Sequence, residues 1–231
     1  MAVNIQWLGH SAFMLSLDGH AVLIDPFLTG NPIATTEPDA LSPEVILLSH
    51  AHGDHLGDTV NIAKANNAPV ITNFEIAEHY LGGQGVENAQ GLNPGGTVDL
   101  DFMTVKFTRA YHSSSFPDGR YGGVPCGFII TTKESGKRLY FAGDTALFSD
   151  MELIGDHGID VAMLPIGDYF TMGPEDSLKA IQMIRPSVVL PMHYNTFPPI
   201  SQNAGDWAES VNRGTKATPI VLDPGGEYTL D

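Results

Sequence analysis

Three histidines and one aspartate lie within six residues, at positions 50–55 of the chain. The apolar residues 45–48 directly before them predict a short buried strand. Gly53 and Gly57 predict that the chain turns directly afterwards, and Asp58 is a candidate cap for a following helix. These side chains are therefore expected on a strand-to-helix loop at the carboxyl end of a strand, where α/β proteins concentrate their binding sites.

The chemistry of this loop favours divalent metal ions, because imidazole nitrogen and carboxylate oxygen are ligands that borderline metals prefer. A single metal cannot easily take all four side chains from so short a segment. In an extended chain His50 and His52 point the same way. Asp54 and His55 then turn towards another point. The spacing therefore predicts two metal positions.

Composition restricts the partners of such a site. The chain has 231 residues, of which 42% are hydrophobic, so it can bury a sizeable core. Acidic residues number 27 and basic residues 11, which gives a formal net charge of −16. A chain of this charge lacks the basic face expected for binding nucleic acid or an anionic membrane. We therefore expect a small-molecule substrate, no nucleic acid and no membrane.

The compartment is inferred from two further features. Cys126 is the only cysteine, so no internal disulfide is possible. The first residues lack the basic and apolar regions of a signal peptide, and no stretch approaches the roughly 18 apolar residues of a membrane span. These features predict a cytoplasmic protein.

Hydrophobic periodicity predicts an alternation of strands and helices along the chain. Strands are expected at 3–8, 12–17, 21–24, 45–48, 69–72, 127–132, 138–142, 161–165, 188–190 and 219–222, with a hairpin or meander over 98–110. Helices are expected at 59–65, 74–81, 150–154, 173–184 and 206–213, and irregular loops at 26–43, 82–97 and 116–125. Each half is rich in strands and ends in helices. The pattern predicts an α/β fold, a four-layer αββα sandwich, formed by a single domain over residues 1–231.

Three more ligand-type residues follow apolar strands. They are His112, Asp144 and His193, and each lies just past the end of a predicted strand. If these strand ends converge at one edge of the sandwich, the three side chains can meet the loop at 50–55.

The order of these seven residues resembles the metallo-β-lactamase superfamily, whose fold is the αββα sandwich. The matching residues are the run His50-x-His52-x-Asp54-His55, followed by His112, Asp144 and His193. More narrowly, residues 7–13, 143–145, 167–174 and 191–194 are similar to UPF0173 metal-dependent hydrolases, which are related to ascorbate-6-phosphate lactonase-like proteins.

This resemblance implies a role for each ligand. His50, His52 and His112 would hold the first metal, and Asp54, His55 and His193 the second, with Asp144 bridging them. Zinc is the expected metal, and manganese, iron or nickel also suit these ligands. A hydroxide between two such metals is a strong nucleophile. A site that works with one metal, or solvated histidines with Asp54 as a helix cap, are the alternatives.

Four weaker candidates each have a structural alternative. His10 is expected to donate a hydrogen bond to substrate or to a ligand, or else to pack under the first hairpin. Asp168 would orient a ligand histidine or cap a turn. Tyr194 would donate to an oxyanion or be a buried aromatic residue. Arg120 would hold an anionic group of the substrate or be a solvated loop residue.

The predicted function is metal-dependent hydrolysis of an ester, lactone or amide bond in a small molecule, and the resemblance favours a lactone. Asp54 would also orient the nucleophile. The alternative is a phosphodiesterase acting on a small phosphodiester. A non-hydrolytic metal or redox protein and a binding protein without turnover are further alternatives, and the pattern leaves the oligomeric state open.

Overall fold

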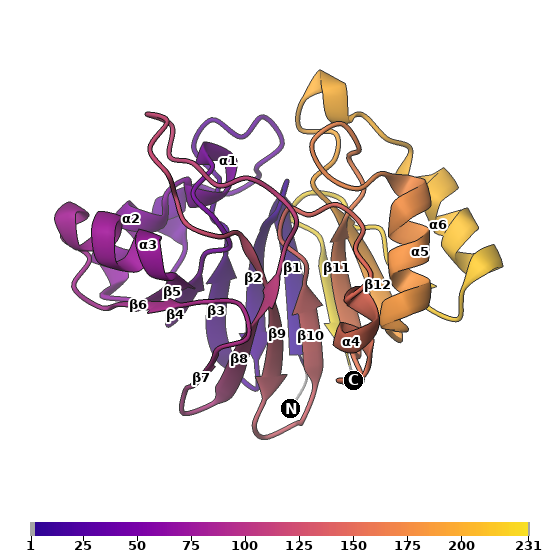
Figure 1. The fold of residues 1–231 in the computed structure, drawn as a ribbon, viewed down its shortest axis with the longest axis horizontal. Coiled ribbons are helices and arrows are strands. Elements are labelled where there is room, and N and C mark those ends of the chain that lie inside the picture. The colour runs from indigo at the N-terminus through magenta and orange to yellow at the C-terminus, as the bar shows by residue number, and fades with distance from the viewer. Residues whose placement is uncertain (1–2, 231) are drawn as a thin grey trace.

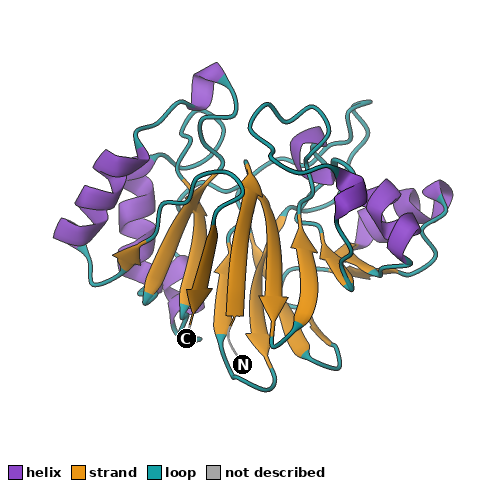
Figure 2. Ribbon diagram, turned by 180° about the vertical axis from the view of Figure 1, so that it is seen from behind, coloured by secondary structure: helices purple, strands orange, loops and turns teal. Residues whose placement is uncertain are grey.

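Two mixed β-sheets packed face to face form the centre of the molecule, and helices cover their outer faces (Figures 1 and 2). The structure is a computed structural model and describes residues 3–230. This architecture confirms the predicted αββα sandwich.

The first sheet has seven strands, in which the N-terminal part is antiparallel and the remainder parallel. Their spatial order is β14 (Glu227–Leu230), β1 (Val3–Gly9), β2 (Ala12–Leu17), β3 (His20–Ile24), β4 (Val45–Leu47), β5 (Val70–Asn73) and β6 (Ala89–Leu92).

The second sheet also has seven strands, and its parallel part lies at the opposite end of the strand order. Their order is β13 (Thr218–Pro219), β12 (Val188–Met192), β11 (Val161–Pro165), β10 (Arg138–Phe141), β9 (Cys126–Thr132), β8 (Met103–Arg109) and β7 (Thr97–Asp99).

The helices divide between the two outer faces (Figure 1). Those on the side of the first sheet are α1 (Gly53–Leu56), α2 (Thr59–Asn66) and α3 (Phe74–Ile76), which continues as a π turn over Ala77–Leu81 and a 3₁₀ turn over Gly82–Gln84. Those on the side of the second sheet are α4 (Met151–Gly155), α5 (Pro174–Ile184) and α6 (Ala204–Gly214). Two further 3₁₀ turns span Pro38–Ala40 and Pro198–Ile200.

The apolar run at 45–48 shows why the sequence of a parallel strand is often apolar at every position. Val45 and Leu47 belong to the core between the two sheets, whereas Ile46 and Leu48 belong to the cluster under the outer helices. Both faces of β4 are therefore covered, so every position of the strand is apolar.

Apart from the 3₁₀ turns, three elements of the described chain were not expected from the sequence. Residues 53–56 form a helical turn, α1, where a loop was predicted. Residues 89–92 form the edge strand β6 inside the predicted loop 82–97. Residues 227–230 form β14, which pairs antiparallel with β1, although the predicted elements ended at residue 222.

Asp58 differs from its predicted role as a helix cap. It occupies the N-cap position of α2, but its side chain makes no capping hydrogen bond. Its carboxylate instead accepts hydrogen bonds from the backbone N–H groups of Leu28 and Thr29 and from the Thr29 hydroxyl. Asp58 therefore fixes the irregular loop after β3 rather than the helix.

The strand directions bring many carboxyl ends to one edge of the sandwich. Strands β1, β3 and β4 run in one direction in the first sheet, and β8, β10, β11 and β12 do so in the second. The loops after these strands gather along the upper edge in Figure 1, away from the chain ends marked N and C. Within residues 3–230, none of the helices combines the length and the apolar character that a membrane span needs.

Candidate metal centre

All seven predicted ligand residues meet at this upper edge. Four come from the segment after β4 and the turn α1. The other three follow β8, β10 and β12 of the second sheet. The centre therefore lies where the two sheets face each other, and each sheet supplies part of it.

His50, His52 and His112 form a first group of ligands. One nitrogen atom from each ring lies within 4.8 Å of the others. Nε2 of His50 is 3.0 Å from Nδ1 of His52. The His112 ring centroid lies 5.3 Å from that of His50 and 5.1 Å from that of His52. The pair from one loop and the histidine from the other sheet thus face a common point.

Asp54, His55 and His193 form a second group, which also includes His10. One ligand atom from each of these four residues lies within 4.8 Å of the others. His10, His55 and His193 are fully or almost fully buried, whereas the side chain of Asp54 is 30% exposed. Asp54 is therefore the member that also reaches solvent.

Asp144 lies between the two groups. Its Oδ2 is 3.5 Å from Nε2 of His112 and 3.0 Å from Nε2 of His193. Its Oδ1 is 3.3 Å from Nε2 of His55. One carboxylate therefore contacts nitrogen atoms of both groups, which is the geometry of a bridging ligand.

Several buried atoms of the centre have no hydrogen bond in the described part of the chain. They include Nε2 of His10, Nε2 of His55 and Oδ1 of Asp144. Buried polar atoms normally find partners, and an unsatisfied one costs roughly 1–3 kcal/mol. Since these atoms are nitrogen and carboxylate oxygen and converge, the residues fit divalent metal ions.

The charges of the centre are strongly coupled. Burial alone would lower the pKa of His55, but Asp144 and Asp25 outweigh it and raise that pKa well above its usual range. Burial opposes ionisation of Asp144, yet His193 and His55 hold the pKa of its carboxyl well below its ordinary value. Burial keeps the pKa of His50 low, so its ring is neutral and able to bind a metal.

Asp25 is a functional residue that the sequence reasoning missed. It is buried, and its carboxylate lies 2.7 Å from Nδ1 of His55 and accepts hydrogen bonds from the backbone and hydroxyl of Ser49. The Ser49 hydroxyl in turn lies 2.9 Å from Nδ1 of His50. Asp25 therefore orients a histidine of each group. Its position at the end of β3, directly beside β4, was the available signal.

His10 lies inside the centre, as one of its two predicted roles requires. Its Nδ1 is 2.8 Å from Oγ1 of Thr196, and its Nε2 is 3.2 Å from Oδ2 of Asp54. Its ring lies 4.1 Å from that of His193. Burial, and then the nearby His193, lower the pKa of His10 to about 4. His10 thus contacts ligand residues of the second group, and Thr196 is a partner that the sequence reasoning missed.

Two predicted site residues are not brought to the ligands. Asp168 follows β11 but is exposed, and among residues 3–230 its side chain makes no hydrogen bond or ion pair with a ligand histidine. Tyr194 is buried and stacks on Trp7 with ring centroids 5.4 Å apart. Burial raises the pKa of Tyr194 to about 12. Tyr194 therefore has its structural alternative, a buried aromatic residue, whereas Asp168 begins a turn through its backbone carbonyl.

The loop after His112 forms one wall beside the centre. Phe116 is buried and stacks on Tyr80 with ring centroids 4.4 Å apart. Asn73 donates a hydrogen bond to the Gly122 carbonyl. Residues 116–125 were expected to be a mobile surface loop, and these contacts instead anchor them to the first sheet. Arg120 pairs with Asp118 at 2.8 Å and does not line the centre.

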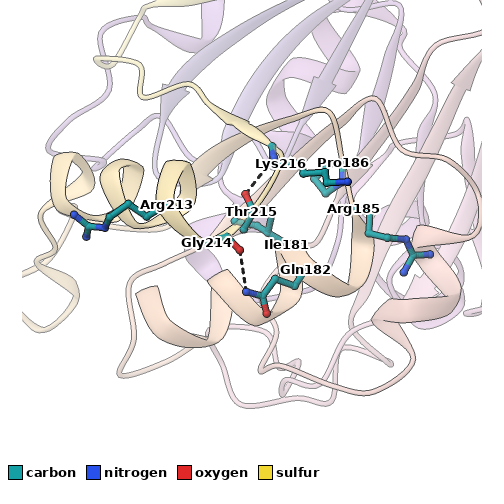
Figure 3. A pocket seen from close by; sticks show the side chains of 9 residues that line it. Ile181, Gln182, Arg185, Pro186, Arg213, Gly214, Thr215 and Lys216 are labelled. Atoms are coloured by element: carbon teal, nitrogen blue, oxygen red, sulfur yellow. Dashed lines mark hydrogen bonds between the residues drawn. The ribbon is translucent and has the colours of Figure 1, made fainter.

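A cavity of about 540 Å³ lies elsewhere, beside the C-terminal ends of α5 and α6. Figure 3 shows the side chains of Arg185 and Arg213 pointing away from each other at its sides. Arg185 pairs with Asp156 and Arg213 with Glu209. Basic residues at helix C-termini also complement the helix dipole. These arginines therefore have structural roles, and the cavity is separate from the metal centre.

Comparison with known proteins defines the class of this fold and site. A family model described as the β-lactamase superfamily domain matches residues 4–193, which include every ligand of both groups. A solved metallo hydrolase from the archaeon Ignicoccus hospitalis is 37% identical, covers 100% of this chain and 99% of its own length, and superimposes with a TM-score of 0.89.

Relatives narrow the class further. A UPF0173 metal-dependent hydrolase of Thermus thermophilus is 48% identical over 229 residues, covering 99% of this chain and 100% of the relative. One from Methanopyrus kandleri is 45% identical over 231 residues, covering 98% of this chain and 99% of the relative. The chain belongs to the UPF0173 metal-dependent hydrolase family of the metallo-β-lactamase superfamily.

Proposed function

We propose that this protein hydrolyses an ester, lactone or amide bond of a small molecule at a centre of two metal ions. The observation that carries the proposal is the position of Asp144. Its carboxylate lies 3.0–3.5 Å from histidine nitrogens of both ligand groups. A carboxylate in this position would be shared by the two ions of a two-metal site.

The ligands divide between two metal positions. His50, His52 and His112 would hold the first ion, and Asp54, His55 and His193 the second, with Asp144 shared. Zinc suits this mixture of imidazole and carboxylate, and manganese, iron or nickel are chemically compatible. Bound divalent ions supply Lewis acidity and lower the pKa of a water molecule between them to roughly 7.

Asp54 is the residue assigned to orient the attacking water. Burial opposes its ionisation, but the neighbouring His10 and His55 hold the pKa of its carboxyl below the usual value. Its side chain is also 30% exposed, so it faces the space from which a substrate arrives. An ionised carboxylate in this position can accept a hydrogen bond from the water and so orient it.

The role of His10 is to hold Asp54 in place. Thr196 contacts one ring nitrogen of His10, and Asp54 lies 3.2 Å from the other. The imidazole therefore connects the loop after β12 to the carboxylate that orients the water. A fixed ring in contact with such a carboxylate restricts its positions and lowers the cost of reaching the reactive geometry.

The chain's charge and its cysteine support the proposed partners and compartment. A formal charge of −16 supports a small substrate rather than nucleic acid. Cys126 is free and buried, as expected of a protein from a reducing cytoplasm. Lactones are the favoured substrates within the proposed class.

The test is metal loading followed by a substrate panel. Purified protein is loaded separately with zinc, manganese, iron and nickel, the bound metal is quantified, and turnover of aryl esters, lactones of several ring sizes, amides and bis(4-nitrophenyl) phosphate is measured. We expect two metal equivalents and turnover of an ester, lactone or amide that a chelator abolishes. Turnover of the phosphodiester alone would establish the phosphodiesterase alternative, and no turnover with two bound metals would contradict hydrolysis of these bonds.

A further inference from the structure

A second cavity, of about 500 Å³, opens beside the first ligand group. One wall is the segment 109–114 that leads from β8 through His112, and the other is part of the anchored loop at 121–125. His112 belongs to both the cavity and the metal centre. A molecule that occupies this cavity therefore has one end at the metals.

Arg109 gives the cavity its charge. The ionisable side chains that line the cavity are Arg109, His112 and two tyrosines. No carboxylate of the described chain lines it. The guanidinium carbon lies 4.7 Å above the ring of Tyr111. Such a cation–π contact holds a guanidinium in place without using its N–H donors for an oxygen atom.

The tyrosine that supports Arg109 is itself fixed. The backbone N–H of Tyr111 donates to Oγ1 of Thr145, and its carbonyl accepts from the N–H of Ala146. Its ring packs on Phe148, with centroids 5.1 Å apart. These contacts attach Arg109 and Tyr111 to the loop that follows the bridging Asp144, so their position is defined relative to the metals.

Arg109 differs from the other arginines of the chain. Arg120, Arg185 and Arg213 pair with carboxylates, and Arg138 donates to the carbonyl of His157. Arg109 makes no ion pair with any residue in the range 3–230, although the chain carries 27 acidic residues. The guanidinium of Arg109 is exposed, has no carboxylate partner and lines the same cavity as His112. It is therefore available to a ligand.

We infer that this cavity, with Arg109 as its anchor, selects substrates that carry an anionic carboxylate or phosphate group on an apolar body. The guanidinium binds the anionic oxygens through paired N–H donors. The rings of Tyr111 and Tyr121, which are 49% and 66% exposed, contact the apolar body.

The chain length between the anchor and the metals limits the size of the substrate. Arg109 precedes His112 by three residues, and three residues of extended chain span about 10 Å. The backbone of the anchor is therefore within about 10 Å of the backbone of a candidate metal ligand, and both side chains line the same cavity. The inference rests on the proposed hydrolysis at the metal centre, because the metals define the other end of the substrate.

The test compares matched esters in the metal-loaded protein. The 4-nitrophenyl half-ester of glutaric acid has a carboxylate where 4-nitrophenyl pentanoate has a methyl group. The third substrate, the 4-nitrophenyl carboxylic ester of 4-phosphonobutanoic acid, has a phosphonate at that end and represents a phosphate group. We expect the wild type to have a higher kcat/KM for an anionic ester than for pentanoate. Arg109→Gln should reduce this ratio about tenfold or more, chiefly through KM, and Arg109→Lys should restore part of it.

Arg120→Gln is the matched control, because Arg120 directly precedes Tyr121 of the cavity wall but does not line the cavity and is paired with Asp118. Its preference ratio should stay at the wild-type value. A ratio that falls in Arg120→Gln and not in Arg109→Gln would overturn the assignment, as would an equal loss on all three esters. Whichever of the two anionic esters is preferred identifies the anionic group.

A binding measurement separates this inference from the proposed function. If the loaded wild type hydrolyses none of the esters, calorimetry with hippurate and its neutral amide in wild type and Arg109→Gln decides the matter. Tighter binding of hippurate that disappears in Arg109→Gln would support the cavity although hydrolysis of these bonds had failed. Equal binding of both compounds, or equal binding by both proteins, would overturn it.

Discussion

Asp54 combines contact with a buried ligand group and partial exposure to solvent. Its Oδ2 lies 3.2 Å from His10, and it belongs to the second ligand group rather than the first. We therefore expect Asp54→Ala to reduce turnover by at least about 10³-fold, because both the group that orients the water and a candidate second-site ligand are lost. Metal analysis of the same sample should show that most first-site metal is retained. Turnover close to the wild-type rate would contradict the assigned mechanism.

His193 follows β12 of the second sheet and is a candidate nitrogen ligand of the second group. Its Nε2 is 3.0 Å from Asp144, and its side chain is only 2% exposed. In His193→Ala we expect bound metal to fall towards one equivalent, as measured by elemental analysis of protein with a native circular dichroism spectrum. His79→Ala is the matched control, because His79 is exposed on the π turn after α3. Unchanged metal content in His193→Ala would remove the second-site assignment.

His55 makes metal binding a proton-releasing reaction. Burial disfavours its charged form, but Asp144 and Asp25 raise its pKa well above the usual range, so the metal-free ring is protonated at neutral pH. A metal ion must replace that proton. Calorimetric metal titrations at pH 7 in buffers of different ionisation enthalpy should therefore show release of about one proton or more. Heats that are independent of the buffer would contradict a charged His55 in the metal-free protein.

The ligand residues were predictable from the sequence because each is a metal-binding type placed just after an apolar strand. Asp25 has the same placement, but it is a single carboxylate before a proline and has no neighbouring histidine in the sequence. Its role depends on β3 lying beside β4, a pairing that brings it to Ser49 and His55. Asp168 also follows a strand, yet its side chain is exposed. Placement after a strand therefore brings a residue to the edge without orienting it.

The turn α1 depends on a close approach to the loop after β3. Gly57 has φ +39°, and a Cβ atom there would collide with the backbone of Pro26 and Phe27. We expect Gly57→Ala to reduce the free energy of unfolding by roughly 1–3 kcal/mol through strain and overpacking. Chemical denaturation measures this change, and Gly82→Ala is the control because a Cβ atom at Gly82 would have no neighbouring atom within 4 Å. Equal stability of the two variants would contradict the tight contact.

The elements that were missed share a physical cause. α1 has only four residues, and β6 and β14 have no fully buried residue. Short or half-exposed edge elements carry little hydrophobic periodicity, and their formation depends on the neighbour with which they pair. The strongly apolar strands β4, β11 and β12 were recognised because burial on both faces requires apolar residues throughout.

The two sheets of the whole molecule meet at the metal centre. The first sheet supplies His50, His52, Asp54 and His55, and the second supplies His112, Asp144 and His193. Metal ions bound there would connect the sheets and stabilise only the folded chain. At a metal concentration 1,000 times the Kd this linkage contributes about 4 kcal/mol, so chelation should lower the Tm by roughly 8–16 °C. Scanning calorimetry tests this, and an unchanged Tm after verified metal removal would contradict the linkage.

The pairing of β14 with β1 has a consequence for synthesis on the ribosome. Val3 pairs with Leu230, so one side of β1, the first strand of the described chain, is completed by β14, its last strand. Until β14 leaves the exit tunnel, β1 has an open edge of unpaired backbone groups of the kind that favours aggregation. The first sheet is therefore completed only after translation of the described chain ends, and nascent chains stalled before residue 227 should depend most on chaperones that cover exposed strands.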